Sequence, residues 1–67
     1  MPIIHVHILE GRSEEKKNRM VRRVSEAVCE TLGAPIETIR VLVHETSPDD
    51  WYVGGASKAE RDRESKN

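Results

Sequence analysis

The sequence predicts a small α/β (α+β) domain: a single β-α-β unit with parallel strands and a short C-terminal hairpin arm, assembled into an oligomer. Three observations predict the unit. Hydropathy alternates with a period of two over residues 3–9, apolar side chains recur at steps of three and four over residues 20–32, and alternation returns over residues 39–45. A strand, a helix and a strand at this spacing form a right-handed crossover with parallel strands.

The first strand has one apolar face and one mixed face. Ile4, Val6 and Ile8 point to one side, and His5 and His7 point to the other. The two imidazoles form a His-x-His pair, but two ligands do not make a metal site. We therefore interpret them as surface or interface histidines with ordinary hydrogen bonds, and no metal site is predicted.

The helix has a start signal, an apolar stripe and a stop signal. Ser13 stands at the N-cap position, and Glu14 and Glu15 place negative charge in the first turn. Gly33 stands where a left-handed residue ends a helix. The apolar stripe consists of Met20, Val21, Val24, Ala27, Val28 and Leu32.

The second strand is predicted from about Ile39 to Glu45. One face carries Ile39, Val41 and Val43, and the other carries Arg40, Leu42 and His44.

The C-terminal part is less regular than the β-α-β unit. The segment from Trp51 to Gly55 is consistent with a very short strand or hairpin arm, and the polar tail that follows is expected to be frayed or loosely helical. We expect residues 2–56 to form the domain and residues 57–67 a charged tail.

The composition explains why an oligomer is expected. The chain has 67 residues, 34% of them charged, and no Phe. A domain of this size buries only about 60% of its unfolded surface, so chains this small usually add disulfides, a metal or partner subunits. The single cysteine, Cys29, excludes an internal disulfide, and no dense metal-ligand cluster is visible.

Charge and hydropathy narrow the classes of partner and the compartment. A formal net charge of −1 gives no electrostatic reason to expect nucleic acid or an anionic membrane. No apolar run approaches the roughly 20 residues of a membrane-spanning helix, and the first residues lack a secretory leader. We expect a cytoplasmic protein.

Four residues are candidates for chemistry. Taken alone, Arg12, Arg40 and Trp51 are more often structural than functional. Removal of Met1 would make the nitrogen of Pro2 a secondary amine, and apolar enclosure with nearby cations disfavours its protonated form. A base tuned in this way suits general acid–base catalysis.

In combination these features are more specific. Met-Pro-Ile-Ile at the start, His-Ile-Leu-Glu-Gly-Arg-Ser at residues 7–13, Gly-Ala-Pro at 33–35, Ile-Arg-Val at 39–41 and Trp-x-x-Gly-Gly at 51–55 belong together. From Pro2 to about Gly55 the chain resembles the 4-oxalocrotonate tautomerase family, and the resemblance implies that it is an isomerase.

The resemblance implies a role for each candidate. Pro2 would be the base that takes a proton from an enol hydroxyl and returns it to carbon. Arg12 would bind the distal carboxylate of a diacid, and Arg40 would hold the reacting end. Trp51, where the family usually has Phe, would form an aromatic wall. No cofactor is implied, and the site would be assembled from neighbouring subunits, usually in a homohexamer built as a trimer of dimers; a hetero-oligomer is the alternative.

The expected activity is ketonisation of 2-hydroxymuconate or a similar dienol, a reaction of aromatic hydrocarbon catabolism. Two alternatives stay open. One is a haloacrylate dehalogenase or hydratase on the same scaffold, which tends to need an extra carboxylate near the proline. The other is a non-catalytic subunit that binds a small acid.

Overall fold

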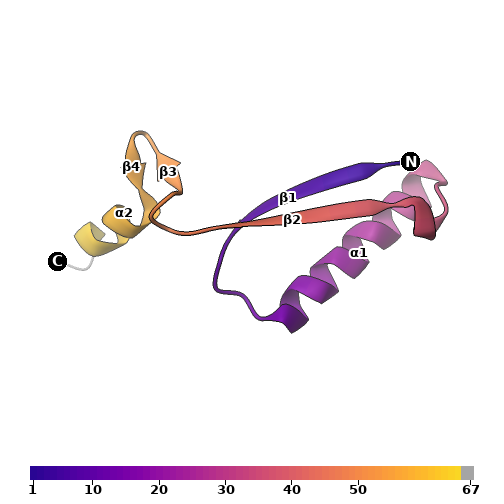
Figure 1. The fold of residues 1–67 in the computed structure, drawn as a ribbon, viewed down its shortest axis with the longest axis horizontal. Helices are drawn as coiled ribbons and strands as arrows, with labels where there is room; N and C mark the ends of the chain where they lie inside the picture. The colour runs from indigo at the N-terminus through magenta and orange to yellow at the C-terminus, as the bar shows by residue number, and fades with distance from the viewer. Residues whose placement is uncertain (66–67) are drawn as a thin grey trace.

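The protein consists of a β-α-β unit followed by a projecting arm. A computed structural model describes residues 1–65. The helix α1 lies along one face of the two-stranded sheet, and the arm extends beyond the far end of β2 (Figure 1). The predicted fold, with parallel strands and a C-terminal hairpin, is confirmed. The elements are β1 (Ile3–Leu9), α1 (Glu14–Leu32), the 3-10 turn η1 (Ile36–Thr38), β2 (Arg40–Thr46), β3 (Tyr52–Val53), β4 (Ala56–Ser57) and α2 (Lys58–Ser65).

The parallel sheet has one continuous register. Ile3 is opposite Arg40 at one end, and Leu9 is opposite Thr46 at the other. β2 therefore begins and ends one residue later than the sequence predicts. The reason is η1: the amide of Ile39 donates to the carbonyl of Ile36 at 3.2 Å, so this amide closes the turn and does not join the ladder.

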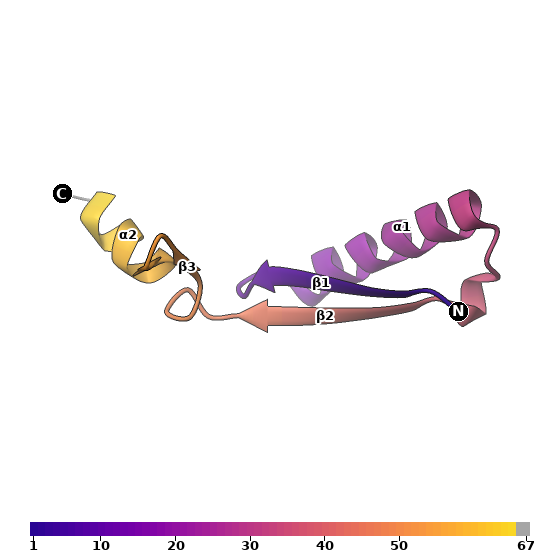
Figure 2. The same cartoon turned by 90° about the horizontal axis from the view of Figure 1, so that it is seen from above.

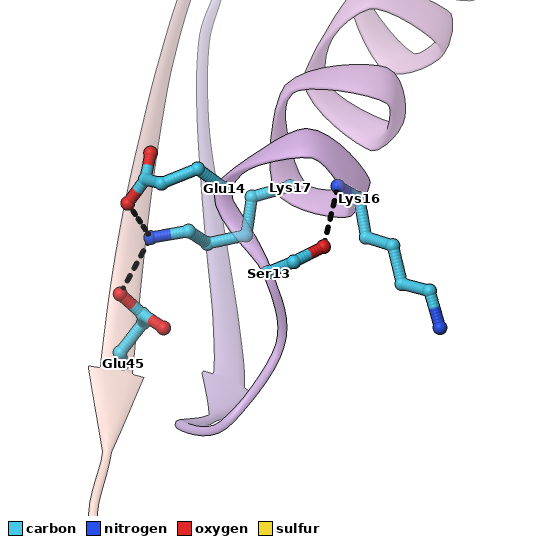
Figure 3. Close-up of polar contacts among 5 residues, drawn as sticks. All are labelled: Ser13, Glu14, Lys16, Lys17 and Glu45. Carbon is cyan, nitrogen blue, oxygen red and sulfur yellow. Dashed lines mark hydrogen bonds and ion pairs between the residues drawn. The ribbon is translucent and has the colours of Figure 1, made fainter.

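Both ends of α1 are capped as the sequence predicts. The Ser13 hydroxyl accepts a hydrogen bond from the amide of Lys16 at 3.2 Å (Figure 3). Gly33 adopts a left-handed conformation with a φ of 69°, and its amide donates to the carbonyl of Cys29 at 3.0 Å. These contacts satisfy backbone groups that a helix end otherwise leaves without partners.

We expect Ser13→Ala to lower the free energy of unfolding by about 1 kcal/mol, because an amide in the first turn loses its acceptor. Urea unfolding followed by circular dichroism at 222 nm would measure the change. Ser25→Ala, the same substitution inside α1, is the matched control. An equal loss in both variants would contradict a capping role for Ser13.

A lysine ties α1 to the sheet. The ammonium of Lys17 donates to Glu14 and to Glu45, both at 2.9 Å, and its side chain is 16% exposed (Figure 3). Glu45 therefore faces α1, and by strand alternation His44 faces away from it. The hydrogen bond to Glu45, and then the one to Glu14, raises the pKa of Lys17 above its usual value of 10.5.

Because the folded-state pKa of Lys17 is raised, its contribution to stability is present below pH 10.5 and is lost as the pH rises through the folded value. We expect the melting temperature of the wild type to fall between pH 9.5 and 11.5 more than that of Lys17→Met. Thermal unfolding followed by circular dichroism measures both. Parallel curves for the two proteins would show that the bridge carries none of this pH dependence.

The single chain has no buried hydrophobic side chain within residues 1–65. Met20, Val21, Val24 and Val28 of the predicted stripe are half-buried, whereas Leu32 is 69% exposed. No element within residues 1–65 covers the opposite face of the sheet (Figure 2). The radius of gyration is 15.7 Å, against about 11 Å for a compact chain of this length. The chain alone is thus thin and extended.

The arm begins with a tight hairpin. Gly54 and Gly55 both have positive φ, 61° and 85°, which is the geometry of a two-residue type I′ turn. This turn pairs Tyr52 with Ser57 and Val53 with Ala56 in antiparallel fashion. The expected hairpin arm is therefore present.

The segment after the hairpin forms a regular helix, α2, and is therefore more ordered than the frayed or loosely helical tail that the sequence predicts. The Ser57 hydroxyl accepts from the amide of Glu60 at 3.1 Å, and Lys58 pairs with Asp62 at 2.6 Å. Residues 66–67 of the expected tail lie outside the described residues. β4 crosses the expected 56/57 boundary, and the division into 2–56 and 57–67 stays a prediction. Neither helix within residues 1–65 has the length and hydropathy of a membrane-spanning segment.

Candidate active site

Two of the four candidate residues meet at one edge of the sheet. Pro2 directly precedes β1 and Arg40 opens β2, and the amide of Arg40 donates to the carbonyl of Pro2 at 3.0 Å. The Arg40 guanidinium donates to the carbonyl of Glu37 at 2.9 Å. A guanidinium has five N–H donors, so most of them remain available to an anion.

The other two candidates follow the opposite edge of the sheet. Arg12 lies after the C-terminal end of β1, and Trp51 after that of β2. Arg12 is exposed, and its guanidinium donates to the carbonyl of Leu9 at 3.0 Å. Trp51 is half-buried at the base of the arm, where its carbonyl accepts from the amide of Lys58 at 2.7 Å.

The two edges are too far apart to hold one small molecule within a single chain. β1 has seven residues, and at about 3.3 Å per residue its ends are about 20 Å apart. A short dicarboxylic acid is far shorter than this. No pocket is present in the part of the chain that the structure describes. The single chain therefore brings together Pro2 and Arg40, but not these two with Arg12 or Trp51.

Neither arginine is neutralised within the described residues. The contacts of both guanidinium groups are to backbone carbonyls, and no ion pair to a carboxylate involves either. An exposed, unpaired guanidinium keeps the planar set of donors that binds a carboxylate in bidentate fashion. Each edge of the sheet thus offers one anion-binding group.

A residue that the sequence did not single out joins the two histidines of β1. His44 of β2 is opposite His7, and its Nε2 atom lies 2.8 Å from Nδ1 of His5. The signal in the sequence was its position on the same face as Arg40 and Leu42. The strand register brings His44 next to His5 and His7, and this register is not visible in the sequence.

Comparison with known proteins agrees with this architecture. A family model described as tautomerase enzyme matches residues 2–61. A 2-hydroxymuconate tautomerase of Pseudomonas putida is 46% identical over 63 residues, covering 91% of this chain and 100% of the relative.

Two solved structures are also similar. TomN, a 4-oxalocrotonate tautomerase homologue in the tomaymycin biosynthetic pathway, has a TM-score of 0.90 and 47% identity, with 92% of this chain and 95% of that one covered. A heterohexamer 4-oxalocrotonate tautomerase from Chloroflexus aurantiacus has a TM-score of 0.85 and 37% identity, with 90% and 97% covered. Because the family match and these relatives span most of its length, the chain belongs to the 4-oxalocrotonate tautomerase family and is an isomerase.

Proposed function

We propose that the chain ketonises 2-hydroxymuconate or a closely related enolic acid by proton transfer through the nitrogen of Pro2. The observation that carries the proposal is the pairing of Pro2 with Arg40 at one edge of the sheet, where the Arg40 amide donates to the Pro2 carbonyl at 3.0 Å. This backbone contact holds the residue that carries the potential base next to the residue that carries the cation. The relatives named 2-hydroxymuconate tautomerase give the substrate class.

The base forms when Met1 is removed. With Met1 attached, the nitrogen of Pro2 is an amide and has no basicity; without it, the nitrogen is a secondary amine. Met1 is 81% exposed, which leaves its peptide bond open to an aminopeptidase. The amine takes the proton of the enol hydroxyl and delivers a proton to carbon, so the double bond shifts while the composition of the substrate stays constant. This transfer needs no metal or organic cofactor.

The two arginines have separate tasks in this proposal. Arg40, beside Pro2, holds the carboxylate and oxygen at the reacting end and stabilises the negative charge that develops there. Arg12 binds the distal carboxylate of a diacid. Trp51 forms an aromatic wall that excludes water from the site.

Because the two edges of the sheet are about 20 Å apart within one chain, the proposed site requires two or more copies. Arg12 and Trp51 of one copy would complete the site at Pro2 of another. The absence of any buried hydrophobic side chain in residues 1–65 also favours association. We propose a homohexamer, built as a trimer of dimers. The alternative is a hetero-oligomer, for which the heterohexamer from Chloroflexus aurantiacus is a precedent.

The test is ultraviolet-monitored ketonisation of 2-hydroxymuconate by purified protein whose mass confirms the loss of Met1. Rapid loss of the dienol absorbance supports the proposal. Sedimentation velocity on the same sample gives the oligomeric state. No activity in a correctly processed oligomer would overturn the proposal. Neither the haloacrylate reaction nor a non-catalytic role is favoured by the relatives.

A further inference from the structure

The 3-10 turn η1 (Ile36–Thr38) lies beside the N-terminus in both views of the fold (Figures 1 and 2). It leads directly into Arg40, the first residue of β2. The hydrogen bonds of a 3-10 turn have poorer geometry than those of an α-helix, and so short a turn has few of them. Each further bond that restrains η1 therefore affects the direction in which its carbonyl groups point.

The bonding pattern of the turn changes at Arg40. The amides of the two residues before it each donate to the carbonyl three positions earlier, at 3.0 and 3.2 Å. The Arg40 amide leaves this series and donates to the carbonyl of Pro2 at 3.0 Å. The carbonyl of Glu37, the next acceptor in the series, accepts from the guanidinium Nη1 of Arg40 at 2.9 Å instead. The turn thus holds the side chain of Arg40 while β1 holds its backbone.

Thr38 restrains this turn through its side chain. Its hydroxyl donates to the carbonyl of Pro35 at 2.7 Å, and its amide donates to the same carbonyl at 3.0 Å. The acceptor is itself restrained, because the ring of Pro35 fixes its φ, here −58°. The amide of Thr38 and the carbonyl of Glu37 belong to one planar peptide group. Two bonds from Thr38 therefore fix the direction of the Glu37 carbonyl.

We propose that Thr38 is a positioning residue for Arg40 and acts through the carbonyl of Glu37. This inference rests on the proposed function, in which Arg40 holds the reacting end of the substrate. A long, flexible arginine side chain loses conformational freedom when it binds a ligand, and ordering it beforehand reduces that loss. One bond to a fixed carbonyl orders the guanidinium and leaves its other N–H groups for a carboxylate.

Thr38→Val tests the proposal, because it keeps the branched shape of the side chain and removes the hydroxyl. Thr38→Ser keeps the hydroxyl and should behave as the wild type. The matched control is Thr31→Val: the Thr31 hydroxyl donates to the carbonyl of Ala27 at 2.7 Å within α1, so this variant loses a bond of the same kind. If Thr38→Val does not fold by circular dichroism, Thr38→Ala replaces it.

The first measurement needs no substrate. Nitrogen-15 relaxation gives the order parameter of the Arg40 Nε–H group, whose signal is identified by its absence in Arg40→Ala. We expect an order parameter above about 0.6 in the wild type and below this value, the range of a flexible group, in Thr38→Val. Thr38→Ser and Thr31→Val should keep the wild-type value.

The second measurement is ketonisation by the processed oligomer. Thr38→Val should lower kcat about three- to tenfold, as for one lost hydrogen bond, and equally for a diacid and a matched monoacid because Arg40 acts at the reacting end. In an Arg40→Ala background the same substitution should have no further effect, since the two residues act as a unit. Thr31→Val should keep wild-type kcat.

An unchanged order parameter of Arg40 in the folded Thr38 variant would overturn the proposal, whatever its kcat. A loss of kcat that adds in full to that of Arg40→Ala would also overturn it, and so would an equal loss in Thr31→Val. A wild type that does not ketonise contradicts the proposed function instead, and the order parameter still decides whether Thr38 positions Arg40.

Discussion

Replacing Pro2 by alanine should lower kcat for ketonisation by about 100-fold or more, the lower end of what a positioned general base contributes. The variant keeps an N-terminal amine after processing, but it loses the secondary amine of the pyrrolidine ring. The strand contact is unaffected, because the amide of Arg40 bonds to the backbone carbonyl of residue 2. Stopped-flow absorbance of the dienol measures the loss.

The control for this experiment is Pro35→Ala, the same substitution at the exposed residue before η1. It should retain wild-type kcat. Mass spectrometry must show that Met1 is absent from every sample, because a retained Met1 blocks the nitrogen by itself. A processed Pro2→Ala protein with wild-type kcat and an unchanged pH profile would rule out Pro2 as the base.

Much of the β-α-β unit follows from local sequence signals. Strand alternation, the Ser13 cap and the Gly33 stop each rest on residues close together in the chain, so their outcome depends little on the rest of the molecule. β2 starts one residue later than predicted, because the amide of Ile39 is hydrogen-bonded within the 3-10 turn. Such a turn depends on three residues and leaves no periodic signal in the sequence.

The regularity of α2 was harder to predict, because this helix has no apolar stripe to reveal it. Its support is local: the Ser57 cap and the pairing of Lys58 with Asp62. Side-chain pairs of this kind contribute only a few tenths of a kcal/mol each. A prediction based on hydropathy therefore does not detect the helix that they support.

The resemblance to the 4-oxalocrotonate tautomerase family indicates the residues of the candidate site. Their positions relative to one another become known only from the folded structure. The sequence places Pro2 and Arg40 far apart, and only the parallel register brings them to one edge. The same register stacks His44 on His7, two residues that are 37 positions apart in the sequence. Contacts of this range depend on strand pairing, which hydropathy patterns specify by face but not by partner.

Arg12→Ala and Arg40→Ala should differ in the substrates they damage. Arg12→Ala should lower kcat/KM for a diacid by about 10- to 100-fold, as expected from loss of a charged hydrogen bond of 1.5–3 kcal/mol, and should leave a matched monoacid nearly unchanged. Arg40→Ala should lower kcat for both substrates by about 100-fold or more, because it acts at the reacting end. Arg23→Ala, on the exposed face of α1, is the control.

The spacing of the two edges adds a sharper test of this assignment. If Arg12 of one copy completes the site at Pro2 of another, then co-refolded Pro2→Ala and Arg12→Ala chains form some sites with both residues intact. When equal amounts of the two chains assemble at random, about a quarter of all sites contain both an intact Pro2 and an intact Arg12. Diacid activity should therefore appear in the mixture far above the sum of the two separate variants. A substrate held by Arg12 of one copy and Pro2 of another requires this gain in diacid activity. If mixed oligomers form without it, Arg12 and Pro2 of different copies do not share a site.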